Sequence, residues 1–362
     1  MPISASTRFG IWTLLKLHGR IAAIRKLEQQ MNLGIVTTLS RCPASVVLCL
    51  SLVAAMAHGE PQAKSPSPEM DADALADWQK PGARLKWIGP NEFGAVSDSV
   101  RKDELEDPIP GFVFGRPMGT ELSKLASPKT PFGISATLSG ALSPAQIRQL
   151  KAFPNLKYLG FNSSGRAKEY GGLGDLQQLE ALEVGWEDGD DAFFKSEVLR
   201  LKKLRHLGLT FGKYTEKTYE MLATMKTLES LHVSHIPFPD AGLQRLTALP
   251  NLKTLSLTSI DVDPKAARFG PKGVATIGKL TKLEHLGLYA TGLKDDDLTV
   301  IAGMSELKSL KISKETLSDA AFAKLAALKN LEKLDILSSK ISKAAVEELK
   351  KAKPDLKITG PK

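Results

Sequence analysis

The stretch LQRLTALPNLKTLSLTSI, residues 243–260, decides the fold of this 362-residue chain. Its first half contains leucines three residues apart, the spacing of one stripe along a helix: Leu243, Leu246 and Leu249. After Pro250 and Asn251, its second half contains the order L-x-x-L-x-L: Leu252, Leu255 and Leu257. The last two leucines have the period of 2 that places side chains on one side of a strand. The stretch therefore predicts a helix, a turn and a short strand, each with one apolar side.

The same pattern recurs over most of the second half of the chain. The first leucines of successive copies are Leu156, Leu179, Leu204, Leu228, Leu252, Leu283, Leu307 and Leu331, which lie 23, 25, 24, 24, 31, 24 and 24 residues apart. A weak copy begins near Phe132, and Leu356-x-Ile358 resembles a truncated last strand. One strand and one helix cannot bury their apolar sides alone, whereas stacked copies can. We expect parallel strands on one side of the stack and helices on the other.

This regularity resembles the leucine-rich repeat family, in particular exported bacterial arrays with units of about 24 residues, and it covers roughly 230 residues. The resemblance implies an α/β leucine-rich repeat solenoid, a curved horseshoe with parallel strands on the concave face and helices on the convex face. The family often places Asn, Cys or Thr three residues after the strand, where the side chain bonds loop backbone. Only three of the eight copies have a hydroxyl residue there, so we do not expect a continuous polar ladder.

Residues 1–57 have the pattern of an export leader with a signal peptide. A mostly apolar run (44–55) ends in Ala55-Met56-Ala57, which predicts cleavage after Ala57. The run is shorter than the roughly 20 residues that span a bilayer. Because thirty residues precede Met31, the sequence favours Met31 as the true start. The alternatives are an uncleaved anchor or a buried helix for the apolar run, and a targeting or membrane-surface helix before Met31.

The remaining chain divides by composition into three parts. Residues 58–70 are rich in Pro and Ser and predict a flexible linker. Residues 71–132 are irregular and predict an N-terminal cap, because a repeat stack must cover its first apolar side with something other than a repeat. A small separate module or a ligand-binding lid is the alternative for this segment. Residues 133–362 form the predicted leucine-rich repeat domain.

Charge and cysteine content exclude several classes of function. The leader holds six basic residues and one acidic residue, and so carries +5 of the net charge of +9. The modest charge of the remainder, together with export, argues against a nucleic-acid partner. Both cysteines, Cys42 and Cys49, lie in the leader. A mature chain would therefore have no disulfide, thiolate metal site or cysteine nucleophile.

Charges in the repeats are sorted by edge. Acidic residues follow the strands, and lysines precede them. Acidic side chains stabilise helix N-termini and basic ones stabilise C-termini, so we attribute this pattern to the helix ends rather than to a ligand.

The third, fifth and seventh residues of each strand unit should face solvent on the concave side. The residues predicted to contact a partner are Tyr158, His206, His232, His285 and Tyr289, together with Arg268 and Phe269 in the insertion 263–270 of the 31-residue repeat. Tyrosine offers contact area and a polar group together. His206 and His232 should be diagonal neighbours on adjacent strands. No carboxylate is expected beside this pair, so we predict no metal and no cofactor, and no catalytic motif is recognisable.

These features together predict an exported, non-enzymatic scaffold that binds a macromolecular partner, in the first place a protein, on its concave face. No nucleic acid is expected to bind, and no stable membrane span is expected after cleavage. One alternative is a protein that binds carbohydrate or a cell-envelope polymer, which clustering of the Tyr and Trp186 side chains in a groove would favour. The other is an enzyme that combines the cap segment with the concave histidines.

Overall fold

The computed structural model describes residues 67–115, 117, 119, 121–136, 142–163, 165–259, 270–313, 315, 317–337 and 341–360. The leader, most of the linker and the insertion with Arg268 and Phe269 lie outside these ranges, so the predictions for them remain predictions. The chain divides into two compact units, Met1–Lys64 and Ser65–Lys362, and the account below concerns the second. Within the described ranges, no helix has the length and apolar content needed to cross a membrane.

The second unit is built on one 13-stranded sheet in the order β13-β12-β11-β10-β9-β8-β7-β6-β5-β4-β3-β1-β2. The strands are β1 Arg84–Pro90, β2 Val96–Ser99, β3 Ile109–Val113, β4 Phe132–Ala136, β5 Leu156–Asn162, β6 Ala181–Gly185, β7 His206–Thr210, β8 Ser230–Ser234, β9 Thr254–Thr258, β10 His285–Tyr289, β11 Ser309–Ser313, β12 Lys333–Leu337 and β13 Lys357–Thr359. From β3 to β13 every neighbouring pair is parallel. The predicted parallel stack is confirmed.

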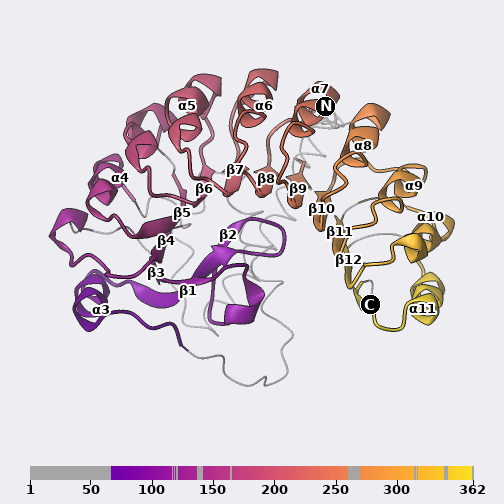
Figure 1. The fold of residues 1–362 in the computed structure, drawn as a ribbon, viewed down its shortest axis with the longest axis horizontal. Helices are drawn as coiled ribbons and strands as arrows, with labels where there is room; N and C mark the ends of the chain where they lie inside the picture. The colour runs from indigo at the N-terminus through magenta and orange to yellow at the C-terminus, as the bar shows by residue number, and fades with distance from the viewer. Residues whose placement is uncertain are drawn as a thin grey trace, which may run out of the picture. The chain divides into compact units, whose positions relative to one another are not determined.

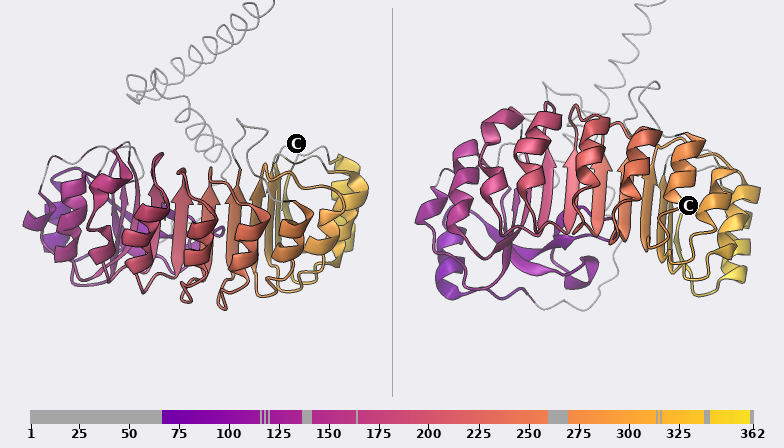
Figure 2. Two further views of the ribbon diagram at one scale, coloured as in Figure 1. Left: turned by 90° about the horizontal axis from the view of Figure 1, so that it is seen from above. Right: turned by 45° about the horizontal axis from the view of Figure 1, so that its top comes forward.

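Helices cover the outer side of the arc that the sheet follows (Figures 1 and 2). The α-helices are α3 Ala72–Gln79, α4 Pro144–Gln149, α5 Asp191–Ser196, α6 Glu216–Leu222, α7 Asp240–Leu246, α8 Pro271–Ile277, α9 Asp297–Ile301, α10 Asp319–Ala323 and α11 Lys343–Ala352. Short 3-10 helices lie at Lys102–Glu104, Leu122–Lys124, Leu150–Ala152, Ala167–Tyr170, Leu173–Asp175, Val198–Arg200 and Lys324–Ala327. Strands lie closer together than helices pack, so the sheet takes the inner side of the curve.

The core is a continuous row of repeat leucines between sheet and helices. Leu231, Leu255 and Leu286, from three successive strands, are fully buried, and they belong to one cluster with the helix leucines Leu246 and Leu222. Each leucine contacts its counterparts in the neighbouring repeats. The stack therefore buries surface that a single repeat would leave exposed.

Side-chain hydrogen bonds join neighbouring repeats before the strands as well as after them. The Asn251 amide donates to the carbonyl of Lys226 at 3.0 Å, and the Asn330 amide donates to that of Ser305 at 2.8 Å. The Thr227 hydroxyl donates to the Leu204 carbonyl at 2.6 Å. These side chains satisfy turn carbonyls that the packing would otherwise leave unpaired.

The charged edges also join neighbouring repeats, which the explanation by helix ends alone did not include. Asp191 accepts hydrogen bonds from the Thr215 N–H at 2.9 Å and from the Thr218 hydroxyl at 2.6 Å in the next repeat. Asp319 accepts from the Ser342 N–H at 2.8 Å. On the opposite edge, Lys226 donates to the carbonyl of Ala248 at 2.8 Å. Both rims thus bond to neighbouring backbone and hydroxyls.

A further regularity concerns the second residue of each strand unit, which alternates in charge along the whole array. The residues are Lys157, Glu180, Arg205, Glu229, Lys253, Glu284, Lys308, Glu332 and Lys357. Ion pairs link Lys157 to Glu180 at 2.9 Å, Arg205 to Glu229 at 2.8 Å, and Glu284 to Lys308 at 2.5 Å. Each such partly exposed pair contributes at most about 1 kcal/mol. The alternation also disfavours pairing of a strand with the strand two repeats along the chain, because like charges would then lie side by side.

The N-terminal part of the unit closes the stack and then turns back over it. The Trp78 ring from α3 is buried and stacks on Phe112 at 4.6 Å between ring centroids. Residues 84–113, from β1 to β3, form what we call the strap. β1 is antiparallel to both β2 and β3, and β2 also contacts β5, β6 and β7. In Figure 1 the strap lies inside the arc of the sheet.

Removing one core leucine should destabilise the whole unit. We expect Leu231→Ala to lower the free energy of unfolding in urea by about 2–5 kcal/mol, because it leaves a cavity among packed leucines. Exposed Lys203 provides the control, and Lys203→Ala should change the same quantity by no more than about 0.5 kcal/mol. Equal effects of the two substitutions would contradict the packing described here.

Candidate functional site

The parallel register places the concave side chains in three straight rows, as predicted. Tyr158, His206 and His285 lie in the row of third positions, together with Ala181, Ser230, Thr254, Ser309 and Lys333. His232 lies in the row of fifth positions, and Tyr289 lies in the row of seventh positions. His206 is paired in register with Ser230, two residues before His232, so the two histidines are diagonal neighbours.

The expectation that these rows face solvent is wrong for much of the concave face. Tyr158 and His206 are each only 3% exposed, because the strap covers them. His232, His285 and Tyr289 are half-buried. Contact between these five residues and a partner remains a prediction, and the first two can take part only if the strap moves.

The strap is attached firmly near the start of the array. The Tyr158 hydroxyl donates to the Asp107 carbonyl at 3.0 Å, and the Ser135 hydroxyl donates to the Asp98 carboxylate at 3.1 Å. A second, smaller apolar cluster fills the space between strap and sheet: Ile88, Val96, Val113, Tyr158 and Ala181. Over this half, the strap is an integral layer of the fold.

Over the later strands, the strap makes mainly polar contacts. Glu92 forms an ion pair with Lys333 at 3.0 Å and accepts a hydrogen bond from the Ser309 hydroxyl. The Lys311 ammonium lies 5.4 Å from the centroid of the Phe93 ring. Glu106 Oε1 lies 3.6 Å from His285 Nε2.

A glycine in the row of fifth positions, Gly287, makes room for this cover, and sequence reasoning overlooked it. A Cβ added at Gly287 would lie 3.2 Å from the Phe93 ring. One added at Gly160 would lie 3.7 Å from the Val96 carbonyl, which is ordinary van der Waals contact. At Gly208, an added Cβ would collide with the Glu183 carboxylate, a side chain of the sheet itself. A glycine at an outward-facing strand position is a sequence signal that another group approaches the strand closely.

Glu183 corrects the expectation that no carboxylate adjoins the histidine pair. It lies in the same row as Gly208 and His232, and its carboxylate extends over Gly208. Burial raises the pKa of Glu183 to about 8, although the Thr210 hydroxyl and the Val96 N–H both donate to the carboxyl group. At neutral pH the protonated form predominates. Burial, followed by the charge of Asp107, also raises the pKa of Glu106 to about 7.

The histidines under the strap are neutral. Burial lowers the pKa of both His206 and His232 to about 4, and it also lowers the pKa of His285. Several buried atoms here have no hydrogen-bond partner in the described part of the chain: Glu183 Oε2, both ring nitrogens of His206, Ser230 Oγ, His232 Nδ1 and His285 Nδ1. These account for six of the seven such side-chain atoms. Many polar atoms buried between strap and sheet therefore lack the hydrogen bonds that buried polar atoms usually make.

Aromatic side chains do not gather in the way that the carbohydrate alternative requires. Trp186 is 1% exposed and packs in the core against Phe161, Tyr170 and Phe193. The half-buried rings of Phe211 and His235 do pack together just after β7 and β8, with centroids 4.9 Å apart. Both residues have positive φ angles of 62° and 57°, which are uncommon for bulky side chains.

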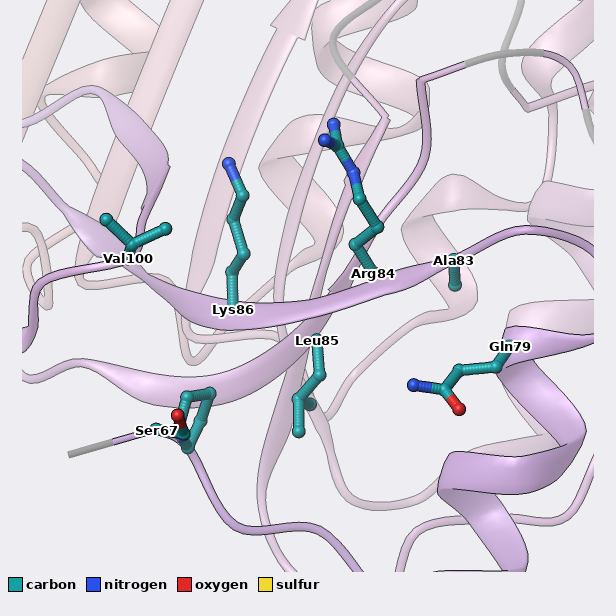
Figure 3. Close-up of a pocket in the computed structure, with 8 residues that line it drawn as sticks. Ser67, Gln79, Ala83, Arg84, Leu85, Lys86 and Val100 are labelled. Carbon is teal, nitrogen blue, oxygen red and sulfur yellow. The ribbon is translucent and has the colours of Figure 1, made fainter.

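One pocket lies on another part of the strap, beside α3 (Figure 3). Arg84 and Lys86 extend to one side of β1, and Leu85 extends to the other. The pocket is lined by Ser67, Pro68, Gln79, Ala83, Arg84, Leu85, Lys86 and Val100. None of the predicted contact residues lines it. Among the described residues, no group of three or more His, Cys, Asp or Glu side chains could hold a metal ion.

Comparison with known proteins agrees with the geometry of a repeat solenoid with a polar inner face. The family model described as "Leucine-rich repeat region" matches residues 143–358. The chain therefore belongs to the leucine-rich repeat family, whose members generally act as protein-binding scaffolds. No curated protein matches the chain.

Two crystal structures illustrate the likeness to solved structures. An internalin (inlF) from Listeria monocytogenes is 18% identical, with a TM-score of 0.45, over 66% of this chain and 68% of that one. An internalin C2 (inlC2) from the same organism is 20% identical, with a TM-score of 0.35, over 61% of this chain and 84% of that one.

Glu183 should make the stability of the protein fall as the pH rises. In the folded state the carboxyl group keeps its proton up to a pKa of about 8, whereas in the unfolded state it loses the proton near 4.5. Its contribution to stability is therefore lost progressively as the pH rises from about 4.5 to about 8. Relative to wild type, Glu183→Gln should become more stable over this range, by at most about 1.4 kcal/mol per pH unit in urea unfolding, with no further change above about pH 8. Glu169→Gln, at an exposed carboxylate, should run parallel to wild type.

His206 and His232 should lower the free energy of unfolding as the pH falls into the acid range. Because their pKa values are lowered to about 4, the unfolded chain takes up protons first as the pH falls below about 6.5. Their contribution to stability is then lost between pH 6.5 and 4. The double variant His206→Gln/His232→Gln should show a smaller drop in unfolding free energy over this range than wild type. An unchanged drop would mean that these rings reach solvent in the folded state.

Proposed function

We propose that this protein is an exported, non-enzymatic scaffold that binds a macromolecular partner, a protein, on the concave side of its sheet. The observation that carries the proposal is the in-register polar rows on the side of the sheet that has no helices. A rigid stack fixes these side chains in place before binding, so little conformational entropy is lost when a partner binds. Export is supported by the signal-like leader, and the modest charge beyond the leader argues against nucleic acid.

The contact residues proposed for the closed protein lie over the later strands. His285 and Tyr289 on β10 are half-buried, and Lys333 on β12 is exposed at the end of the same surface. His232 is adjacent and half-buried. Tyr158 and His206 would contribute only after movement of the strap, and Arg268 and Phe269 in the insertion remain proposed contacts.

Binding is favoured over catalysis by what lies around the histidines. His206 is neutral and covered by the strap, His232 is neutral and half-buried, and the described pocket beside α3 contains neither of them. A general base must reach the proton that it removes, and the His206 ring is closed off from a substrate.

Photo-cross-linking tests the proposed face directly. With the photoreactive amino acid benzoylphenylalanine in place of Tyr289, we expect irradiation in a cell-envelope extract to yield a discrete, protease-sensitive adduct. The matched control carries the same group in place of Gln244, which is exposed on α7 on the helical side. If only the variant at Gln244 gave adducts, the partner would bind on the helical side, contrary to the proposal. An adduct that resists protease and is removed by periodate would indicate a carbohydrate partner.

A further inference from the structure

The tip of the strap is a preformed turn at residues 91–95, which we call the strap turn. The Asn91 side-chain oxygen accepts hydrogen bonds from the N–H groups of Phe93 at 3.0 Å and Ala95 at 3.2 Å. The Gly94 N–H donates to the Asn91 carbonyl at 2.8 Å, and Gly94 has a φ of 82° that favours glycine. The turn therefore holds its own shape and presents Glu92 and Phe93 to the sheet.

Each residue at the tip of the turn has a matching feature on β8 to β12. The Glu92 carboxylate meets the Ser309 hydroxyl and the Lys333 ammonium. The Phe93 ring fills the space above Gly287, with the Lys311 ammonium at 5.4 Å from its centroid. These contacts use the chemistry of peptide recognition, namely a charge-assisted hydrogen bond, a cation–π contact and an aromatic side chain in a gap.

The Gly94 backbone lies directly against the β8–β9 part of this surface. A Cβ added at Gly94 would lie 1.9 Å from Ser230 Oγ and 3.3 Å from the Thr254 side chain. Even so, Ser230 Oγ is one of the buried atoms without a hydrogen-bond partner.

The strap also leaves buried polar atoms of this floor without hydrogen-bond partners. Besides Ser230 Oγ, the unpaired atoms on β8 and β10 are His232 Nδ1 and His285 Nδ1. Each buried polar atom without a partner makes the closed contact less favourable than one that is fully hydrogen-bonded. A peptide that reproduces the Glu and Phe contacts and also bonds these groups could compete with the strap turn.

We infer that the floor formed by β8 to β12 is a docking site for a peptide segment in which an acidic residue is followed by an aromatic one, and that the strap turn occupies this site in cis. The inference rests on the proposed function and specifies the chemistry of its partner. A tethered segment acts at an effective concentration in the millimolar range, so it competes strongly with a free peptide. The wild-type protein should therefore be largely closed to such peptides.

The test uses the full chain and a fluorescein-labelled peptide of residues 88–99, IGPNEFGAVSDS. Fluorescence anisotropy should show the variant Glu92→Ala/Phe93→Ala binding this peptide at least about tenfold more tightly than wild type does, because its own turn no longer competes. A peptide with Gln and Ala in place of the Glu and Phe should lose at least tenfold in affinity. If the double variant loses its fold by circular dichroism, Phe93→Ala alone takes its place.

Substitutions in the floor make the inference falsifiable. In the opened variant, Lys333→Ala removes the partner of the acidic residue, and Gly287→Leu fills the gap for the aromatic ring. Each should weaken peptide binding severalfold or more, whereas Gln244→Ala on the helical side should not change it. A folded, opened variant with no saturable binding would overturn the inference. Binding that is indifferent to both floor substitutions would overturn it as well.

The same opened variant, cross-linked through position 289, separates this inference from the proposed function. A protein adduct without peptide binding would leave the scaffold role standing and refute the acidic–aromatic specificity. Loss of both the adduct and peptide binding would refute both.

Discussion

The structure depends on the stacking of repeat leucines, because no single repeat can bury its own apolar side. Leu231, Leu255 and Leu286 are buried by one another and by the helices outside them. The other regular features follow from this spacing: the parallel register, the Asn and Thr side chains that bond turn carbonyls, and the aspartates that bond the next repeat. The alternation of charge at the second strand position adds little stability per pair, but it favours the pairing of each repeat with its neighbours in the chain.

The strap determines which side chains of the concave face are accessible to solvent. A bare array would present its polar rows to solvent, whereas here Tyr158 and His206 lie beneath the chain's own residues 84–113. Near β5 the strap is held by an apolar cluster, and near β10 to β12 it is held by Glu92, Phe93 and Glu106. The contact between strap and sheet near β5 therefore resembles a hydrophobic core. The contact near β10 to β12 resembles an occupied binding site.

Buried ionisable groups under the strap give the closed state opposing dependences on pH. Glu183 and Glu106 favour the covered arrangement when protonated, and His206 and His232 favour it when neutral. Stability from these groups is therefore greatest at intermediate pH, since acid charges the imidazoles and base charges the carboxyls. The same four side chains that set the pH dependence of the covered state therefore also lie at the contact between the strap and the concave face.

From Phe132 onward, the sequence by itself determined the repeat, the alternation of strands and helices, the parallel pairing and the rows in which Tyr158, His206, His232, His285 and Tyr289 lie. These follow from local periodicity, and each copy repeats the same evidence. Only the tertiary structure decided what covers those rows, because the contacts of Glu92 with Ser309 and Lys333 join residues more than 200 positions apart and follow no period. Gly287, which leaves room for the Phe93 ring, is one sign of this cover in the sequence. A glycine does not indicate which segment of the chain will cover it, since the absence of a side chain leaves room for any neighbour.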